Sequence, residues 1–92
     1  MESIIQDEKK CFVCGTTYNL ESHHCIYGNA NRKLSEKYGL KLWLCHEHHT
    51  GKCGVHFNKN LDCAIKQLAQ RKYEERFGNR ESFRSIFGKS YL

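Results

Sequence analysis

Two short stretches decide the fold: Cys-Phe-Val-Cys-Gly at residues 11–15 and Cys-His-Glu-His-His at residues 45–49. The first separates Cys11 and Cys14 by two residues, so both sulfurs can reach one ion while the glycine turns the backbone. The second repeats this spacing with Cys45 and His48. Together the two half-sites predict one tetrahedral zinc site, and a site with four protein ligands is structural.

The cysteine count leaves two alternatives open. Cys53 could replace one of the four ligands, and the six cysteines could instead form disulfides. The first eight residues are acidic and lack the apolar run of a signal peptide. Cysteines that occur together with histidines at ligand spacing favour a metal. We therefore expect bound zinc and a reducing, cytoplasmic location.

The sequence around these stretches predicts a small α+β domain. We expect an extended segment at 18–26, a helix at 29–38 ended by Gly39, a strand at 40–45 and a turn at 46–54. A long helix should begin at Val55 or Asn58 and run to Phe77, and a short one should follow Asn79. Trp43, Cys25 and Cys63 are expected in the core.

Length and charge limit the classes of function. A chain of 92 residues predicts one domain (1–92), with its core at about 11–77 and a C-terminal helix within 78–92. No run of apolar residues is long enough for a membrane span, so we expect no membrane partner. Residues 28–92 hold 13 Lys and Arg against six acids, which suits a nucleic acid but also a solvated surface.

Four further histidines form a second group: His23, His24, His49 and His56. His23 and His24 are adjacent in an extended segment and should point to opposite faces. His49 directly follows the second zinc half-site, which should hold it near the same strand end. Four imidazoles outside the zinc site are difficult to explain as core packing and indicate a second metal or catalytic site.

The series of motifs resembles the HNH, or His-Me finger, nucleases across residues 11–77. It is similar to small HNH-like proteins of phages and prophages, including a RecA-dependent phage nuclease. The resemblance implies a ββα-metal fold with a structural zinc knuckle and a C-terminal helical extension. It implies His24 as general base, and Asn31, or alternatively Asn29, as the central asparagine. The ligands of the catalytic ion would be His23, His49 and His56.

The resemblance also implies the reaction and the partner. An HNH endonuclease or nickase hydrolyses DNA phosphodiester bonds with a divalent ion, which would here be Mg, Mn, Ni or Zn. Imidazole ligands favour Mn, Ni and Zn over Mg. Phosphate contacts are expected from basic residues between the strands, namely Arg32, Lys33, Lys37 and Lys41. A protein of this class would act in a bacterial cytoplasm.

A different class of function remains open. The chain could be a non-catalytic zinc module of a phage that binds DNA or a protein of the host or phage, for example as an inhibitor of host defence. A protein partner could also be required for cleavage. The usual place of the central asparagine, just before the second strand, holds Tyr-Gly-Leu-Lys at 38–41.

Overall fold

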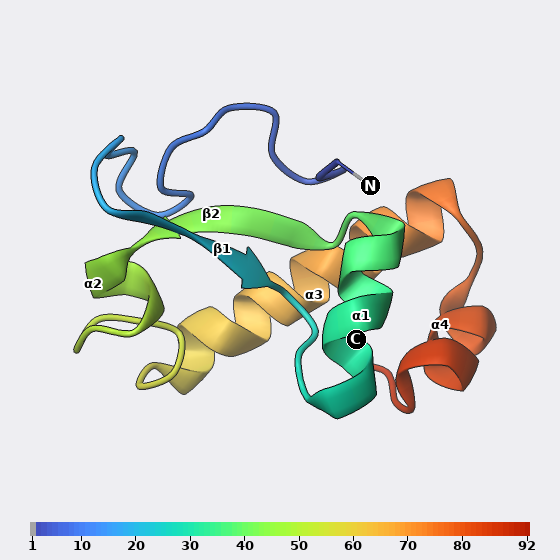
Figure 1. The fold of residues 1–92 in the computed structure, drawn as a ribbon. Coiled ribbons are helices and arrows are strands. Elements are labelled where there is room, and N and C mark those ends of the chain that lie inside the picture. Colours follow the sequence, from blue (N-terminus) through green and yellow to red (C-terminus); the bar gives the residue numbers. More distant parts are fainter. Residues whose placement is uncertain (1) are drawn as a thin grey trace.

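The computed structural model describes residues 2–92, in which a two-stranded antiparallel sheet lies among four helices (Figure 1). The elements are β1 (Leu20–His24), α1 (Asn29–Tyr38), β2 (Lys41–Cys45), α2 (His46–His49), α3 (Lys59–Arg76) and α4 (Arg80–Phe87). The Cα radius of gyration of 12.6 Å matches the ~12 Å of a compact chain of this length. The predicted α+β class is confirmed.

The two strands set the direction of the adjacent histidines. His23 lies opposite Leu42 and His24 lies opposite Lys41 in the antiparallel register. Neighbouring strand residues point to opposite faces. His23 is accordingly buried, at 2% exposed, whereas the side chain of His24 is 22% exposed.

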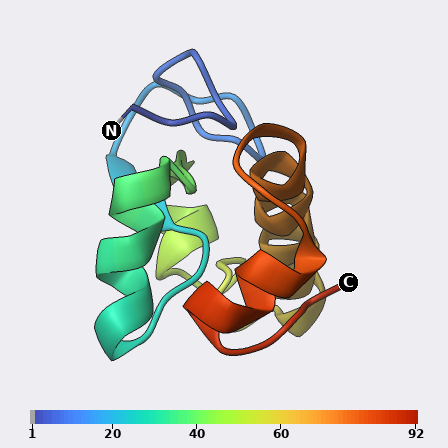
Figure 2. The same ribbon diagram turned by 90° about the vertical axis from the view of Figure 1, so that its right-hand side faces the viewer.

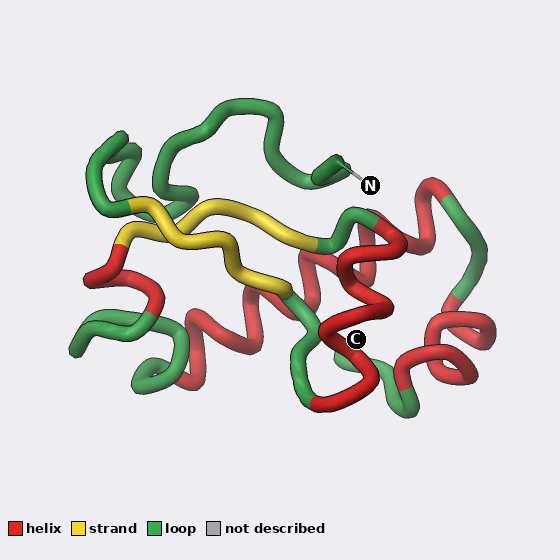
Figure 3. The backbone as a smooth tube through the Cα atoms, viewed as in Figure 1, coloured by secondary structure: helices red, strands yellow, loops and turns green. Residues whose placement is uncertain are grey.

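The N-terminal segment runs beside β2 before the first regular element begins (Figure 3). The backbone N–H of Phe12 donates to the carbonyl of Trp43, and the N–H of Trp43 donates to Oε1 of Gln6. These bonds occupy the second edge of β2, which would otherwise be open to pairing with another strand. They also bring Cys11 next to the end of β2.

The helix ends follow the sequence signals. Gly39 ends α1 with φ of 71°, and a Cβ there would collide with the backbone of Glu2. Asn58 caps α3 by accepting from the N–H of Leu61 at 3.1 Å, and Asn79 caps α4 in a capping box with Ser82. Figure 2 shows α1 on one side of the fold and α3 with α4 on the other. None of the helices in residues 2–92 combines the length and apolar character needed to cross a bilayer.

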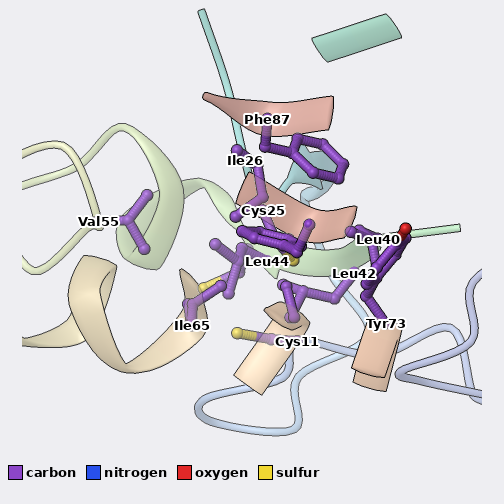
Figure 4. Close-up of a cluster of buried hydrophobic side chains, with 13 residues drawn as sticks. Cys11, Cys25, Ile26, Leu40, Leu42, Leu44, Val55, Ile65, Tyr73 and Phe87 are labelled. Carbon is purple, nitrogen blue, oxygen red and sulfur yellow. The ribbon is translucent and has the colours of Figure 1, made fainter. Parts of the chain in front are cut away.

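One core joins the sheet to the helices (Figure 4). The rings of Phe83 and Phe87 stack with centroids 4.6 Å apart, and Tyr73 meets Phe83 edge to face at 5.4 Å. The predicted C-terminal helix therefore packs into the same core as α3. The other buried apolar residues are Cys11, Cys25, Ile26, Leu40, Leu42, Leu44, Cys45, Val55, Ile65 and Ala69.

Three expectations about local structure are wrong. The predicted turn at 46–54 begins with the one-turn helix α2. Trp43 is only half-buried, and the ammonium of Lys9 lies 4.8 Å from its ring centroid. Cys63 is exposed, because it lies about 200° around α3 from the buried Ile65.

Candidate metal centres

The four predicted zinc ligands lie together and form what we call the zinc cluster: Cys11, Cys14, Cys45 and His48. Their ligand atoms all lie within 4.8 Å of one another. The Sγ atoms of Cys14 and Cys45 are 3.8 Å apart, and Nδ1 of His48 lies 3.2 Å and 3.8 Å from Sγ of Cys45 and Cys11. Regular tetrahedral zinc requires separations of about 3.8 Å between sulfurs and about 3.5 Å between sulfur and nitrogen. The cluster could therefore hold a metal ion such as zinc.

Local backbone structure arranges the zinc cluster. In the first half-site, the N–H of Gly15 donates to the carbonyl of Cys11 and turns the chain. Cys45 ends β2 and precedes α2, which carries His48. Burial opposes ionisation of Cys11, but hydrogen bonds from neighbouring backbone groups lower the pKa of its thiol to about 6. Cys53, the alternative ligand, is exposed and lies outside the cluster.

A second group of potential ligands, the histidine cluster, comprises His23, His49 and His56. One ring nitrogen from each lies within 4.8 Å of the other two. The ring centroids of His23 and His49 are 5.2 Å apart, and those of His49 and His56 are 5.3 Å apart. The three rings come from β1, from α2 and from the loop before α3, so the fold brings together residues far apart in sequence.

His23 has the properties of a neutral ligand. Burial, followed by the nearby charges of His49 and His56, lowers the pKa of its imidazole to about 4. The neutral ring therefore keeps a lone pair that can bind a metal. Its Nε2 atom is buried and has no hydrogen-bond partner. An unpaired buried polar atom is costly, and an ion within the histidine cluster would satisfy it.

Glu21 orients His49 from outside the cluster. A carboxylate only accepts, so Nδ1–H of His49 donates to Oε1 of Glu21 at 2.6 Å, while Oε2 lies 3.1 Å from Nδ1 of His46. These bonds, first from His49 and then from His46, lower the pKa of the Glu21 carboxyl. The bond leaves Nε2 of His49 with its lone pair, and carboxylate–histidine pairs of this kind support metal ligands in proteins.

His24 is held by a different carboxylate. Its Nε2 lies 3.0 Å from Oε1 of Glu36 on α1, and Nζ of Lys41 lies 2.5 Å from Oε2 of the same residue. The bonds from Lys41 and His24 lower the pKa of Glu36 to about 2. The carboxylate is thus ionised and accepts from Nε2–H, so the lone pair of His24 resides on Nδ1.

These side chains share one cavity of about 360 Å³, the histidine pocket, lined by Ser22, His23, His24, Tyr27, Arg32, His49 and His56. The predicted base and the three predicted ligands of the second metal therefore border one cavity, which His23 and His24 reach from the end of β1. Tyr27 is held from α3, because its hydroxyl donates to Oδ2 of Asp62 at 3.0 Å. Arg32 places a permanent positive charge at the pocket.

The sequence matches no known protein family, and neither a curated protein nor a solved structure is significantly similar to it. The resemblance to HNH nucleases therefore rests on the sequence motifs alone.

The other predicted site residues lie in different environments. Arg32 lines the histidine pocket, and Lys33 and Lys37 are exposed on α1. Lys41 forms an ion pair with Glu36. Asn31 does not line the pocket, because Nδ2 of Asn31 donates to the carbonyl of Phe87 at 3.2 Å and ties α1 to the end of α4.

Sequence reasoning missed the carboxylates that support the histidines. Glu21 lies two residues before His23. Its contact with His49 depends on the pairing of β1 with β2, which places Glu21 opposite Leu44, close to the start of α2. Glu36 is twelve residues from His24 and reaches it because α1 folds back beside the sheet. An acidic residue near a histidine pair is a weak signal, since glutamates are common on exposed helix faces.

Proposed function

We propose that this chain is a metal-dependent endonuclease or nickase of the HNH (His-Me finger) type that hydrolyses DNA phosphodiester bonds. The observation that carries the proposal is the histidine pocket, which His24 lines together with the three residues of the histidine cluster. One group is suited to proton transfer and the other to binding a divalent ion. Hydrolysis of a phosphodiester requires both.

The chemistry follows from the states of the side chains. Nδ1 of His24 has a lone pair and would take a proton from the attacking water. A divalent ion bound by the histidine cluster would neutralise negative charge that develops on the phosphate and the leaving oxygen. The guanidinium of Arg32 would pair with a non-bridging phosphate oxygen and fix the position of the backbone. The resemblance to HNH nucleases implies products with a 5′-phosphate and a 3′-hydroxyl.

The order of elements supports the proposed ββα-metal fold. In the proposed ββα-metal arrangement, β1 and β2 form the strand pair and α2 begins the metal-binding helical part. The zinc cluster holds α2 against the end of β2, and the very next residue is His49 of the histidine cluster. Zinc would therefore act structurally, by fixing the position of a ligand to the second ion.

DNA is the proposed partner because of the charge around the pocket. The net charge of the chain is +5, and the exposed Lys33 and Lys37 extend the basic surface along α1 from Arg32. These side chains would contact phosphates and carry little sequence information. Binding should accordingly weaken as the salt concentration rises.

A plasmid-nicking assay tests the proposal. Zinc-loaded protein is incubated with supercoiled DNA and Mn²⁺, Mg²⁺, Ni²⁺ or added Zn²⁺, beside His24→Ala. A control is Tyr18→Ala, which removes a ring that is 78% exposed and lies outside the pocket. The proposal expects nicking by the wild type and by Tyr18→Ala and a loss of about 10²–10⁴-fold in His24→Ala. Equal rates in the wild type and His24→Ala would exclude it.

One observation favours a second candidate, a non-catalytic zinc module that binds DNA. The asparagine expected to support the base is bonded to α4 instead of lying at the pocket. This candidate predicts DNA binding through α1 without cleavage under any of the four ions. The same assay, read beside a gel-shift measurement, separates the two.

A further inference from the structure

The geometry points to Glu36, braced by Lys41, as the positioning residue that fixes the ring and the tautomer of His24. The inference rests on the proposed nuclease function and assigns it a residue outside the HNH motif. Glu36 would do the work that the central asparagine is expected to do. Asn31 does not do this work, because its amide is bonded to the carbonyl of Phe87.

Three elements build this arrangement. His24 ends β1, Lys41 begins β2, and the two residues are direct partners across the sheet. Directly paired residues have side chains on the same face. Glu36 reaches this face from α1, and its partners there include His24, 3.0 Å from Oε1, and Lys41, 2.5 Å from Oε2. The carboxylate therefore bridges the ends of both strands.

The position of the bridge makes it more than a surface ion pair. The side chains of His24 and Lys41 are only 22% and 24% exposed, although that of Glu36 is 47% exposed. His24 thus lines the histidine pocket while Nε2 of its ring is bonded to the carboxylate of Glu36. Lys41 is predicted from the sequence to contact phosphate. In the structure its ammonium pairs with the carboxylate of Glu36.

A carboxylate at Nε2 has a specific chemical consequence. It accepts only from Nε2–H, so the neutral ring keeps its lone pair on Nδ1. In the reaction, Nδ1 takes one proton from water while the water oxygen forms a bond to phosphorus. The bond from phosphorus to the leaving oxygen breaks, and that oxygen takes its electron pair and then a proton from solvent. The imidazolium so formed is stabilised by the adjacent Glu36 carboxylate.

The first test is spectroscopic and does not depend on activity. Nitrogen-15 spectra of the zinc-loaded full chain, recorded where the ring is neutral, report which nitrogen of His24 carries the proton. The inference expects the proton on Nε2 in the wild type and a mixture of tautomers in Glu36→Ala. A wild-type ring protonated on Nδ1, or an unchanged tautomer in Glu36→Ala, would overturn it.

The second test measures cleavage of DNA by Glu36→Gln, which keeps the side-chain shape, and by Glu36→Ala. Glu75→Gln on α3 is the matched control, because it removes an exposed glutamate distant in sequence from the pocket residues. We expect kcat to fall about 10- to 100-fold in both Glu36 variants, with KM, zinc content and thermal midpoint close to those of the wild type. Glu75→Gln should cleave like the wild type.

The outcomes separate the positioning role of Glu36 from the proposed nuclease function. If His24→Ala loses activity while both Glu36 variants keep the wild-type kcat, the nuclease function stands and the positioning role falls. If the wild type and His24→Ala are equally inactive with every ion, the proposed function itself falls. A third outcome would also overturn the positioning role. In it, Glu36→Gln loses kcat only because it loses zinc or the folded state, and folded molecules of Glu36→Ala have a normal kcat.

Discussion

Removing the ion from the zinc cluster should unfold this protein. Cys11 is 1% exposed and Cys45 is 7% exposed, so two ligands are also part of the core. Without an ion, their polar sulfurs would be buried beside Nδ1 of His48 with no charge to compensate them. The loop that carries Cys14 would also lose its attachment to the start of α2.

The magnitude follows from a comparison of two free energies. A domain of this size is stable by about 5–14 kcal/mol in total. A structural zinc site in a small domain contributes an apparent ~10–16 kcal/mol at neutral pH. The contribution of the ion is therefore of the same size as the whole free energy of unfolding, and the metal-free chain should not hold a cooperative fold.

Thermal melting followed by circular dichroism measures this directly. The zinc-loaded protein should show one sharp transition, and both the chelated protein and Cys11→Ala should show none. Cys53→Ala is the matched control, because that cysteine is exposed and outside the zinc cluster, and it should melt like the wild type. A chelated protein with a cooperative transition at a similar midpoint would refute the reasoning.

Three further predictions follow from single contacts. Glu21→Gln should lower the affinity of zinc-loaded protein for Mn²⁺ by about 10- to 100-fold in calorimetric titration, because His49 loses its carboxylate; an unchanged affinity would contradict this role. Asn31→Ala should cost about 0.5–1.5 kcal/mol in urea unfolding through its lost bond to Phe87, while a collapse of DNA cleavage per folded molecule would restore the role predicted from the sequence. Phe83→Ala, at a fully buried position, should cost about 3–5 kcal/mol, against less than about 0.5 kcal/mol for Phe57→Ala, which is 73% exposed.

The local signals in this sequence predicted much of the fold. The spacing of Cys11 and Cys14 gave the first half-site, and Asn79 marked the start of the last helix. Gly39 marked the end of α1. Such features depend on a few neighbouring residues, whose preferences for turns, caps and ligand spacing are intrinsic to the chain.

Long-range contacts between polar side chains could not be predicted in the same way. Glu36 is one of several acids on helices, and only the packing of α1 beside the strand ends gives it His24 and Lys41 as partners. Asn31 is the converse case, since a residue that fitted a motif by type is bonded to α4. In both cases the role depends on tertiary placement, which the spacing of residues along the chain does not specify.

Anomalous diffraction from zinc-loaded crystals soaked in Mn²⁺ would show whether both clusters bind metal. We expect one zinc peak inside the zinc cluster and a separate manganese peak between His23, His49 and His56, which disappears in His49→Ala. A map from crystals saturated with Mn²⁺ that contains the zinc peak alone would contradict the claim that the histidine pocket is a metal-dependent catalytic site.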